Sequence, residues 1–491
     1  MTSAFMSMKL VGAIFVVLQL NLLLSNYCGA DAAKHVGSGG CIEKERRILL
    51  ELKASLVLND THLLSTWDSK SDCCSWKGVV CSNQTGHVET LNLNGDQFGY
   101  FRGKINVSFM ELQHLKYLNF SHQYRCSNNF LKFVGSLNNL IVLDLQHSNL
   151  SGRIPNEIAR LSHLQHLDLS FNSLEGEIPR QLENISYLQH LDLRYNKLVG
   201  TIPRQFGKLS NLKHLDLGSN FHLVGSIPCE IGNISHLQYL DLSSNKLVGT
   251  IPNQFGKLSN LQELHLGFND GLRFHDKNNH VGGEWLSNLT LLTHLDLSLV
   301  QNLNSSYVWL KMICKLPKIE ELTLISCDLK DLFLSQSILN ISLWDICTLH
   351  SLNVGFNYFN EDISTILPES SRCARYSLQN LMLYGNQITG KFLDLSIFPN
   401  LKSIDLSNNM LSGKVPDGDF PSKLETLRFT GNSLEGGIPK SFGNLCSLRS
   451  LDLSGNKLSE YLPVILHNLS VGCAKNSLKE LLPLVSYIRK S

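Results

Sequence analysis

The chain has 491 residues, 43 of them basic and 42 acidic, so its formal net charge is +1. This balance argues against a nucleic-acid-binding protein and against a polybasic membrane-surface protein, because both classes need an excess of basic side chains. Length alone favours about three domains of roughly 150 residues, but leucine is so abundant that an internal repeat must be sought before domains are counted.

Residues 1–30 have the pattern of a secretory signal peptide. Residues 1–9 carry one positive charge, residues 10–24 form an apolar run, and small residues end at Ala30. This order is typical of a signal cleaved after Ala30, and the run is shorter than the about 20 residues that a membrane-spanning helix needs. We therefore expect an exported chain, extracellular or at the cell surface, without a membrane span after cleavage.

A linker is predicted over residues 31–40, and a cysteine-rich cap over residues 41–88. Its four cysteines are Cys41, Cys73, Cys74 and Cys81. Zinc is disfavoured, because two of them are adjacent and no second closely spaced pair exists; disulfides are favoured in an exported chain. The adjacent cysteines should not join each other, since a vicinal bridge is strained. Two pairings remain open, and we favour Cys41–Cys73 with Cys74–Cys81.

Residues 89–470 contain an internal repeat with the pattern L-x-x-L-x-L-x-x-N. Its steps are 24 or 25 residues from Leu118 to Leu264, become irregular from 264 to 380, and then shorten again. We count fifteen repeats, a number that makes a chance match negligible and predicts leucine-rich repeats. Their second leucine, or its equivalent, stands at Leu91, Leu118, Leu143, Leu167, Leu191, Leu215, Leu240, Leu264, Leu295, Leu322, Leu352, Leu381, Ile404, Leu427 and Leu451.

Each repeat position has a physical reason. The L-x-L segment should form a short strand with its leucines inward, and parallel strands should stack into a solenoid with one apolar core. The predicted fold is an α/β solenoid, a horseshoe with parallel strands on its concave face and a disulfide-bonded N-terminal cap. Asparagine at the turn can hydrogen-bond to buried backbone; it stands at Asn172, Asn196, Asn245, Asn386, Asn409, Asn432 and Asn456.

Specific motifs resemble a known family. The Leu-x-Gly-x-Ile-Pro segments, such as residues 198–203, look like the plant-specific class of leucine-rich repeats, and residues 41–81 resemble the plant N-terminal cap. The irregular stretch and the phrase 373–381 are similar to those of plant receptor-like proteins, which are related to receptor kinase ectodomains. The resemblance implies recognition of an extracellular peptide, protein or glycan, and defence signalling through a partner receptor kinase or adaptor at the plasma membrane.

Residues 471–491 depart from that family. An incomplete sixteenth repeat opens at Cys473 and then loses the pattern, which we interpret as a truncated tail because relatives continue with more repeats, a C-terminal cap and a membrane helix. Two alternatives to a receptor stay open. One is a secreted inhibitor of microbial wall-degrading enzymes, resembling the polygalacturonase-inhibiting proteins, and the other is a non-functional truncated product.

The sequence offers no convincing enzyme chemistry. The ordered kinase motifs and the G-x-S-x-G elbow are missing, and the glycines of residues 37–40 lie in the linker, where no strand and helix can make a phosphate cradle. His163 and His166 have H-x-x-H spacing, but we expect them on different faces and without a third ligand. We predict neither a cofactor nor a metal site, and no nucleic-acid partner.

Glycosylation sequons are numerous, and each can accept a glycan only where it is exposed. Asn149 is expected at the inward turn position and therefore unmodified, and a further sequon stands at Asn119. The candidate acceptors are Asn59, Asn83, Asn106, Asn184, Asn233, Asn288, Asn304, Asn340 and Asn468, of which those at 184, 233, 288 and 468 share one repeat phase and should lie along one flank.

Two columns of strand residues flank the second leucine and should face solvent on the concave side. We predict that they form part of the ligand surface together with the aromatic and arginine side chains beside them, because such side chains are typical binding anchors. The alternative stays open that aspartate is the ordinary residue of this repeat class and histidine a solvated neighbour, since exposed pairs contribute little. Carboxylates should keep the histidines charged, so binding should change between about pH 5 and 7. The candidate residues are His166, Asp168, Phe171, His190, Asp192, Arg194, Tyr195, His214, Asp216, Tyr239, Asp241, Glu263 and Phe268.

Overall fold

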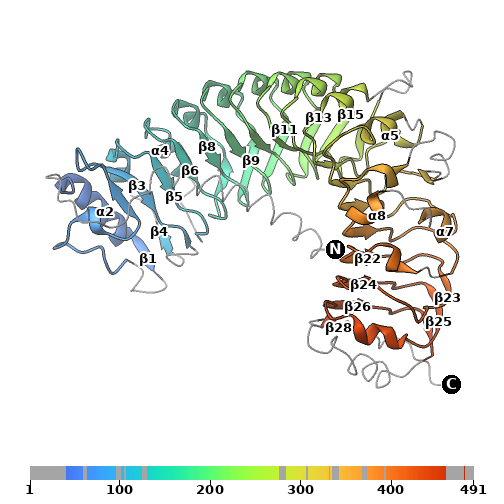
Figure 1. Cartoon of the computed structure of the whole chain (residues 1–491). Coiled ribbons are helices and arrows are strands. Elements are labelled where there is room, and N and C mark those ends of the chain that lie inside the picture. The colour runs from blue at the N-terminus through green and yellow to red at the C-terminus, as the bar shows by residue number, and fades with distance from the viewer. Residues whose placement is uncertain are drawn as a thin grey trace.

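The computed structural model describes residues 40–58, 64–95, 101–103, 107–123, 130–275, 283–305, 308–330, 332–333, 342–367, 373–391, 394–459 and 480–481. The expected signal peptide, nearly all of the linker and most of the tail lie outside these residues. Figure 1 shows repeats stacked side by side along an arc, with the cap at one end. Within the described part of the chain, no helix is long and apolar enough to cross a bilayer.

The cap covers the first repeat. Its helix α2 (Glu43–Ser55) turns Leu49 and Leu52 inward, and its strand β2 (Val79–Cys81) pairs antiparallel with β3 (Val88–Asn92). The apolar end of the solenoid is therefore shielded from water, as terminal repeats require. The other elements of the cap region are η1 (Cys73–Ser75), β1 (Leu56–Leu58) and β4 (Phe101–Gly103), the last two forming a small antiparallel pair.

Disulfides and buried side chains close the cap. The pairing favoured from the sequence is confirmed: Cys41–Cys73 and Cys74–Cys81. The buried rings of Trp67 and Trp76 stack with centroids 5.3 Å apart. The buried carboxylate of Glu45 accepts the N–H of Val88 at 2.7 Å, which ties α2 to the first strand of the repeats.

One parallel sheet lines the concave face of the repeats. Its strands pair in register, repeat leucine beside repeat leucine, as Leu167 does with Leu191. The end strands β2 and β28 each have one partner, so the sheet is open. After β3 its strands are β5 (Tyr117–Asn119), β6 (Val142–Asp144), β8 (His166–Asp168), β10 (His190–Asp192), β12 (His214–Asp216), β14 (Tyr239–Asp241), β16 (Glu263–His265), β18 (His294–Asp296), β19 (Glu321–Thr323), β20 (Ser351–Asn353), β21 (Asn380–Met382), β22 (Ser403–Asp405), β24 (Thr426–Arg428), β26 (Ser450–Asp452) and β28 (Glu480–Leu481).

The core is a continuous leucine stack. Leu191, Leu193 and Leu198 are fully buried, and the same holds for the equivalent leucines of the neighbouring repeats. Burying one such side chain contributes about 1.5–3 kcal/mol. Because each repeat buries its leucines only against its neighbours, stability accumulates along the stack.

Turn asparagines hold the repeats together, as predicted. Asn172 donates through Nδ2 to the carbonyls of Leu145 and Leu169 at 2.9 and 3.0 Å, and its Oδ1 accepts the N–H of Leu150 at 2.8 Å. One amide thus satisfies buried backbone in two repeats. The other predicted asparagines make the same type of contact, and so do three that the sequence pattern missed: Asn220, Asn269 and Asn357.

A second sheet of six strands, and later in the chain a separate one of three, form around the Leu-x-Gly segments, and the sequence did not predict them. The segments were expected only to steer the chain outward, but they pair in parallel from repeat to repeat. Glycine fits because the backbone is left-handed there, with φ of 80° at Gly200 and 88° at Gly249. The strands are β7 (Ser151–Arg153), β9 (Ser173–Glu177), β11 (Lys197–Thr201), β13 (His222–Ser226), β15 (Lys246–Thr250) and β17 (Gly271–Arg273), and later β23 (Ser412–Lys414), β25 (Ser433–Gly436) and β27 (Lys457–Leu458).

Short 3₁₀ helices, rather than α-helices, complete most of the regular repeats. Several follow a proline such as Pro203, whose fixed φ begins the turn. Gly207 lets neighbouring helices approach, since a Cβ there would lie 2.4 Å from the carbonyl oxygen of Glu230. The 3₁₀ helices of these repeats are η2 (Val107–Glu111), η3 (Asn156–Arg160), η4 (Arg180–Asn184), η5 (Arg204–Lys208), η6 (Cys229–Asn233), η7 (Asn253–Lys257), η8 (Glu284–Asn288) and η12 (Lys440–Asn444).

The irregular repeats in the middle of the chain are held together by a disulfide and by hydrogen bonds of buried tryptophans. A disulfide joins Cys347 to Cys373, one repeat apart, which sequence analysis missed. The indole N–H groups of Trp309 and Trp344 donate to the carbonyls of Leu303 and Ile366. The outer elements of this middle region are η9 (Leu303–Ser305), α5 (Val308–Ile313), η10 (Leu343–Asp345), α7 (Ile363–Ile366), α8 (Ala374–Ser377) and η11 (Leu395–Ile397). One further short helix, α4 (Phe130–Val134), lies near the cap.

Candidate functional site

The position before the repeat leucine carries four stacked rings: His166, His190, His214 and Tyr239. Consecutive ring centroids are 4.1, 4.1 and 4.2 Å apart, and the rings lie within 17° of parallel. They stack because in-register parallel strands about 4.8 Å apart place equivalent side chains together. We call these four residues the ring column.

The position after the repeat leucine carries carboxylates that the sequence analysis placed in solvent. That placement is wrong for Asp168, Asp192, Asp216 and Asp241, which are at most 7% exposed. Each accepts through Oδ1 the N–H two residues further on, at 2.7–3.0 Å. These four residues, the aspartate column, therefore hold the turn after each strand and present little surface to a ligand.

Arg194 lies between two of these carboxylates. Its Nε is 3.2 Å from Asp192 Oδ2, and its Nη1 is 3.3 Å from Asp216 Oδ2. The guanidinium also lies over the ring of Phe171, 5.2 Å from its centroid. Burial alone would lower the pKa of Arg194, but the two carboxylates raise it above its ordinary value. Arg194 is thus a fixed cation that links the aspartate column to the ring of Phe171.

A third column lies at the turn after the strand. Phe171 and Tyr195 stack with centroids 4.5 Å apart, and His147 stacks on Phe171 at 4.2 Å. Sequence analysis named the first two and missed His147, whose place in the register was available as a signal. Phe268 occupies the same turn position, but Ser219 and Ser244 stand there in the two repeats between, so it does not join the stack. We call His147, Phe171 and Tyr195 the turn column.

The ring and aspartate positions change character at β16. There Glu263 replaces a ring and His265 replaces an aspartate, with 3.5 Å between His265 Nε2 and Glu263 Oε2. Burial alone would lower the pKa of His265, but Glu263, Asp241 and Asp296 raise it to about 9. Burial alone would raise the pKa of Glu263, and the hydrogen bond with His265 lowers it instead. This end of the face holds an ion pair.

The expectation that carboxylates keep the column histidines charged is wrong. Burial lowers the pKa of His166, and it lowers the pKa of His190 and His214 further still. Neighbouring imidazoles lower the pKa of His190 in addition. The nearby carboxylates oppose this only weakly, since burial also raises the pKa of Asp192. The pKa of each of the three imidazoles is therefore shifted in the direction opposite to the one that the sequence analysis predicted.

The sequons fall into exposed and buried groups. Asn184, Asn233 and Asn288 are exposed at the last position of η4, η6 and η8, so they lie in one phase of the repeat. Asn83 and Asn304 are exposed as well. The other candidate acceptors lie outside the described residues: Asn59, Asn106, Asn340 and Asn468.

The sequons at Asn149 and Asn119 differ in their exposure to solvent. The prediction that Asn149 points inward is wrong: it is exposed, and Ser148 occupies the inward position with its Oγ donating to the Phe120 carbonyl at 2.7 Å. The register was misassigned by one residue because serine replaces the usual asparagine. Asn119 is buried and donates to Asp144 at 3.0 Å. Of these two sequons, only Asn149 is presented to solvent.

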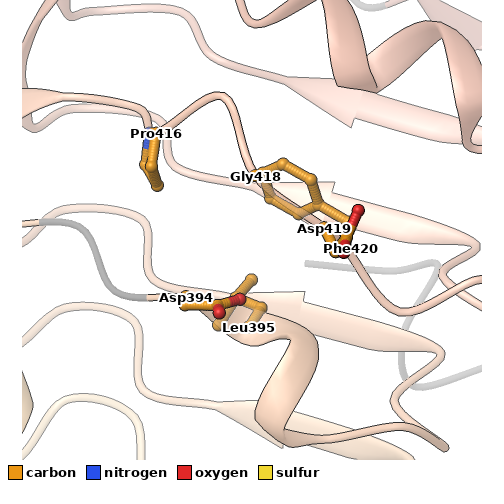
Figure 2. Close-up of a pocket in the computed structure, with 6 residues that line it drawn as sticks. All are labelled: Asp394, Leu395, Pro416, Gly418, Asp419 and Phe420. Atoms are coloured by element: carbon orange, nitrogen blue, oxygen red, sulfur yellow. The ribbon is translucent and has the colours of Figure 1, made fainter.

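Two cavities of the described part of the chain lie away from the three columns of the concave face. Figure 2 shows one of about 160 Å³, with Asp394 and Leu395 on one side and the loop after β23 on the other. The carboxylate of Asp394 already accepts the N–H of Ser396 at 2.8 Å. A second cavity of about 220 Å³ lies beside Trp285 on η8. Neither contains residues of the three columns.

Family models match most of the repeat region and the cap. Residues 180–415 match a leucine-rich repeat region, and residues 42–82 match a leucine rich repeat N-terminal domain. Residues 399–458 and two stretches between 139 and 185 match leucine rich repeat models. Receptor-like protein EIX2 of Solanum lycopersicum is 38% identical over 149 residues, which are 29% of this chain and 14% of that protein. The match thus spans less than a fifth of the relative's length.

Solved structures show the same architecture. The chain is similar to the HAESA receptor kinase ectodomain of Arabidopsis in complex with an IDA peptide hormone that is lengthened at its N-terminus, with a TM-score of 0.66, 28% identity, and coverage of 84% of this chain and 66% of that one. It is also similar to the GASSHO1/SCHENGEN3 ectodomain of Arabidopsis thaliana in complex with CASPARIAN STRIP INTEGRITY FACTOR 2, with a TM-score of 0.65, 28% identity, and coverage of 87% and 49%.

Proposed function

Because this chain belongs to the leucine-rich repeat family and is related to plant receptor-like proteins, we propose that it is the extracellular ligand-recognition module of a plant cell-surface receptor-like protein. Its role is recognition without catalysis. The ligand is an extended peptide that lies along the concave face, across the ring column and the turn column. The recognition event serves defence, and a partner receptor kinase transmits it.

The aromatic residues of the turn column carry this proposal. Phe171 and Tyr195 have φ of 54° and 51°, a left-handed conformation that is unfavourable for bulky side chains and costs about 1–2 kcal/mol per residue. Glycine occupies the same turn position at Gly385 and Gly431 with φ of 68°. The turn can therefore be made without strain, and strained aromatic residues at one surface point to a binding role.

Several observations support a peptide ligand and an extracellular location. Two similar ectodomains are known in complex with a peptide hormone and with a named factor. Aromatic rings and a fixed arginine supply contact area and hydrogen-bond donors at little entropic cost, which suits a flexible peptide. The disulfides of the cap suit an oxidising compartment, and the exposed sequons Asn184, Asn233 and Asn288 suit passage through the secretory pathway.

A displayed library of random peptides, selected against the secreted chain, tests the proposal. Selected peptides should bind the wild-type chain and lose at least about thirtyfold in affinity with Tyr195→Ala, which corresponds to a binding hot spot of about 2 kcal/mol. Tyr187→Ala is the matched control, because Tyr187 is exposed but lies outside the columns. Failure to select any peptide, or equal binding by both variants, would contradict the proposal. Binding of a microbial polygalacturonase without peptide binding would replace the receptor by an inhibitor.

A further inference from the structure

We propose that His166, Asp168 and His190 bind a divalent transition-metal ion of the zinc type on the concave face. One potential ligand atom of each residue lies within 4.8 Å of those of the other two. All three stand on the neighbouring strands β8 and β10, whose register brings the two histidines side by side. The site goes beyond the proposed function, which needs no metal.

Unmet hydrogen-bonding capacity is the first argument. The Nε2 of His190 is buried and has no hydrogen-bond partner among the described residues, and leaving such a group unsatisfied is destabilising. His166 and Asp168 are each only 7% exposed. A metal ion would satisfy the ring nitrogen where no protein group reaches it. Neutral imidazole is also the form that coordinates a metal.

Unbalanced charge is the second argument. Asp144, Asp168 and Asp192 lie on adjacent strands in register, and carboxyl groups at such positions disfavour each other's ionisation unless a cation lies beside them. Arg194 compensates Asp192, but the equivalent residue one repeat earlier is Ser170, whose buried Oγ is also without a partner. A cation beside Asp168 would supply the charge that the chain itself supplies beside Asp192.

The chemistry of the ligands selects the metal. Zinc binds imidazole nitrogen at about 2.0–2.1 Å and carboxylate oxygen at about 2.0–2.2 Å. Imidazole suits zinc, copper and nickel, whereas magnesium and calcium prefer oxygen ligands alone. The stacked rings, 4.1 Å apart, must tilt toward one ion to bind it, because an imidazole nitrogen coordinates a metal in the plane of its own ring. Three protein ligands leave a fourth coordination position, which can accept a carboxylate or imidazole of a bound ligand.

A neighbouring group of residues is a weaker site. His190, Asp192 and His214 also bring ligand atoms within 4.8 Å of one another, and His214 Nε2 is likewise buried without a partner. However, Asp192 already pairs with Arg194 at 3.2 Å. A metal there would displace an ion pair and lie close to the guanidinium. We therefore place the ion at His166 and Asp168, with His190 shared.

Titration of the secreted full chain with Zn²⁺ by calorimetry tests the site, and Co²⁺ with its visible absorption reports the ligand geometry. We expect the wild-type chain to bind one equivalent of Zn²⁺. The variants His166→Gln, Asp168→Asn and His190→Gln should each weaken Zn²⁺ binding at least about tenfold, because even the loss of a residue that only orients a metal ligand weakens metal affinity by about that much. Asp168→Asn preserves the turn, because Asn119 and Asn353 accept the same N–H in their own repeats.

Control variants separate this site from its alternatives. His214→Gln and His163→Gln should bind Zn²⁺ as the wild-type chain does, since His163 lies apart and its Nδ1 contacts the Asn138 carbonyl at 3.1 Å. Loss of binding with His214→Gln but not with His166→Gln would overturn the placement. Absence of stoichiometric Zn²⁺ binding by the folded wild-type chain would overturn the proposal itself, and it would leave the peptide-binding proposal untouched.

Discussion

Replacing His265 by glutamine should weaken the solenoid in a way that depends on pH. His265 stands where its neighbours carry carboxylates: Asp241 on β14 and Asp296 on β18 lie beside it in register, and Glu263 Oε2 is 3.5 Å from its Nε2. Glutamine has a similar size but cannot take up a proton. The variant therefore removes the one cation that the described residues place among these three carboxylates.

The size of the effect follows from the pKa of His265. Raising that pKa from 6.5 to about 9 corresponds to about 3 kcal/mol, at 1.36 kcal/mol per pKa unit. The side chain is only 20% exposed, so solvent screens the pair little. Because the folded pKa is raised, the stabilisation is complete below pH 6.5 and disappears as the pH rises from 6.5 to about 9.

Thermal denaturation at pH 6 and at pH 9.5 measures the difference. His265→Gln should melt below the wild-type chain at pH 6, and the gap should shrink at pH 9.5, where the wild-type imidazole has lost its proton. His236→Gln is the control, since His236 is exposed and its Nδ1 lies 2.9 Å from the neutral Ser210 carbonyl. An equal gap at both pH values would refute the electrostatic reasoning, because lost packing does not depend on pH.

Three further outcomes are expected. Asn409→Ala should destabilise the chain by about 2–3 kcal/mol, because buried turn backbone loses its amide partner; hydrogen exchange should rise in the flanking repeats and not in the cap. Replacing both Cys347 and Cys373 by serine should cost about 3 kcal/mol; limited proteolysis should then cut between them, and unchanged resistance would argue against the staple. Glycopeptide mass spectrometry of the secreted chain should find glycan on Asn149 and none on Asn119, and the reverse pattern would contradict their exposure.

The repeat register was readable from the sequence because two residue types mark it every turn. Leucines at fixed spacing gave the strand positions, and in-register pairing then brought His166, His190 and His214 together as predicted. Asparagines such as Asn172 gave the turn position and its hydrogen bonds. Where serine took that position, at Ser148, the assignment slipped by one residue and Asn149 was placed wrongly.

Burial and protonation could not be read in the same way. Whether Asp168 faces solvent depends on the turn that follows, which folds the N–H of Ser170 back onto its carboxylate. The low pKa of His190 depends on rings from two other repeats that cover it. The second sheet was missed because a Leu-x-Gly segment alternates too briefly to signal a strand. The bond between Cys347 and Cys373 was missed because irregular repeat lengths hide their shared phase.

The strand positions before and after the repeat leucine differ in how firmly they are tied to the backbone, and this affects how such a chain acquires new binding specificities. The aspartate column is tied to the backbone of its own turn, whereas the position before each leucine holds histidine, tyrosine, glutamate, serine, asparagine, threonine or valine without a change in strand pairing. Along β8 to β14, variation can therefore accumulate at the position before the leucine while the aspartate after it stays tied to its turn. A designer, or a lineage under selection, could rewrite the recognition surface one repeat at a time.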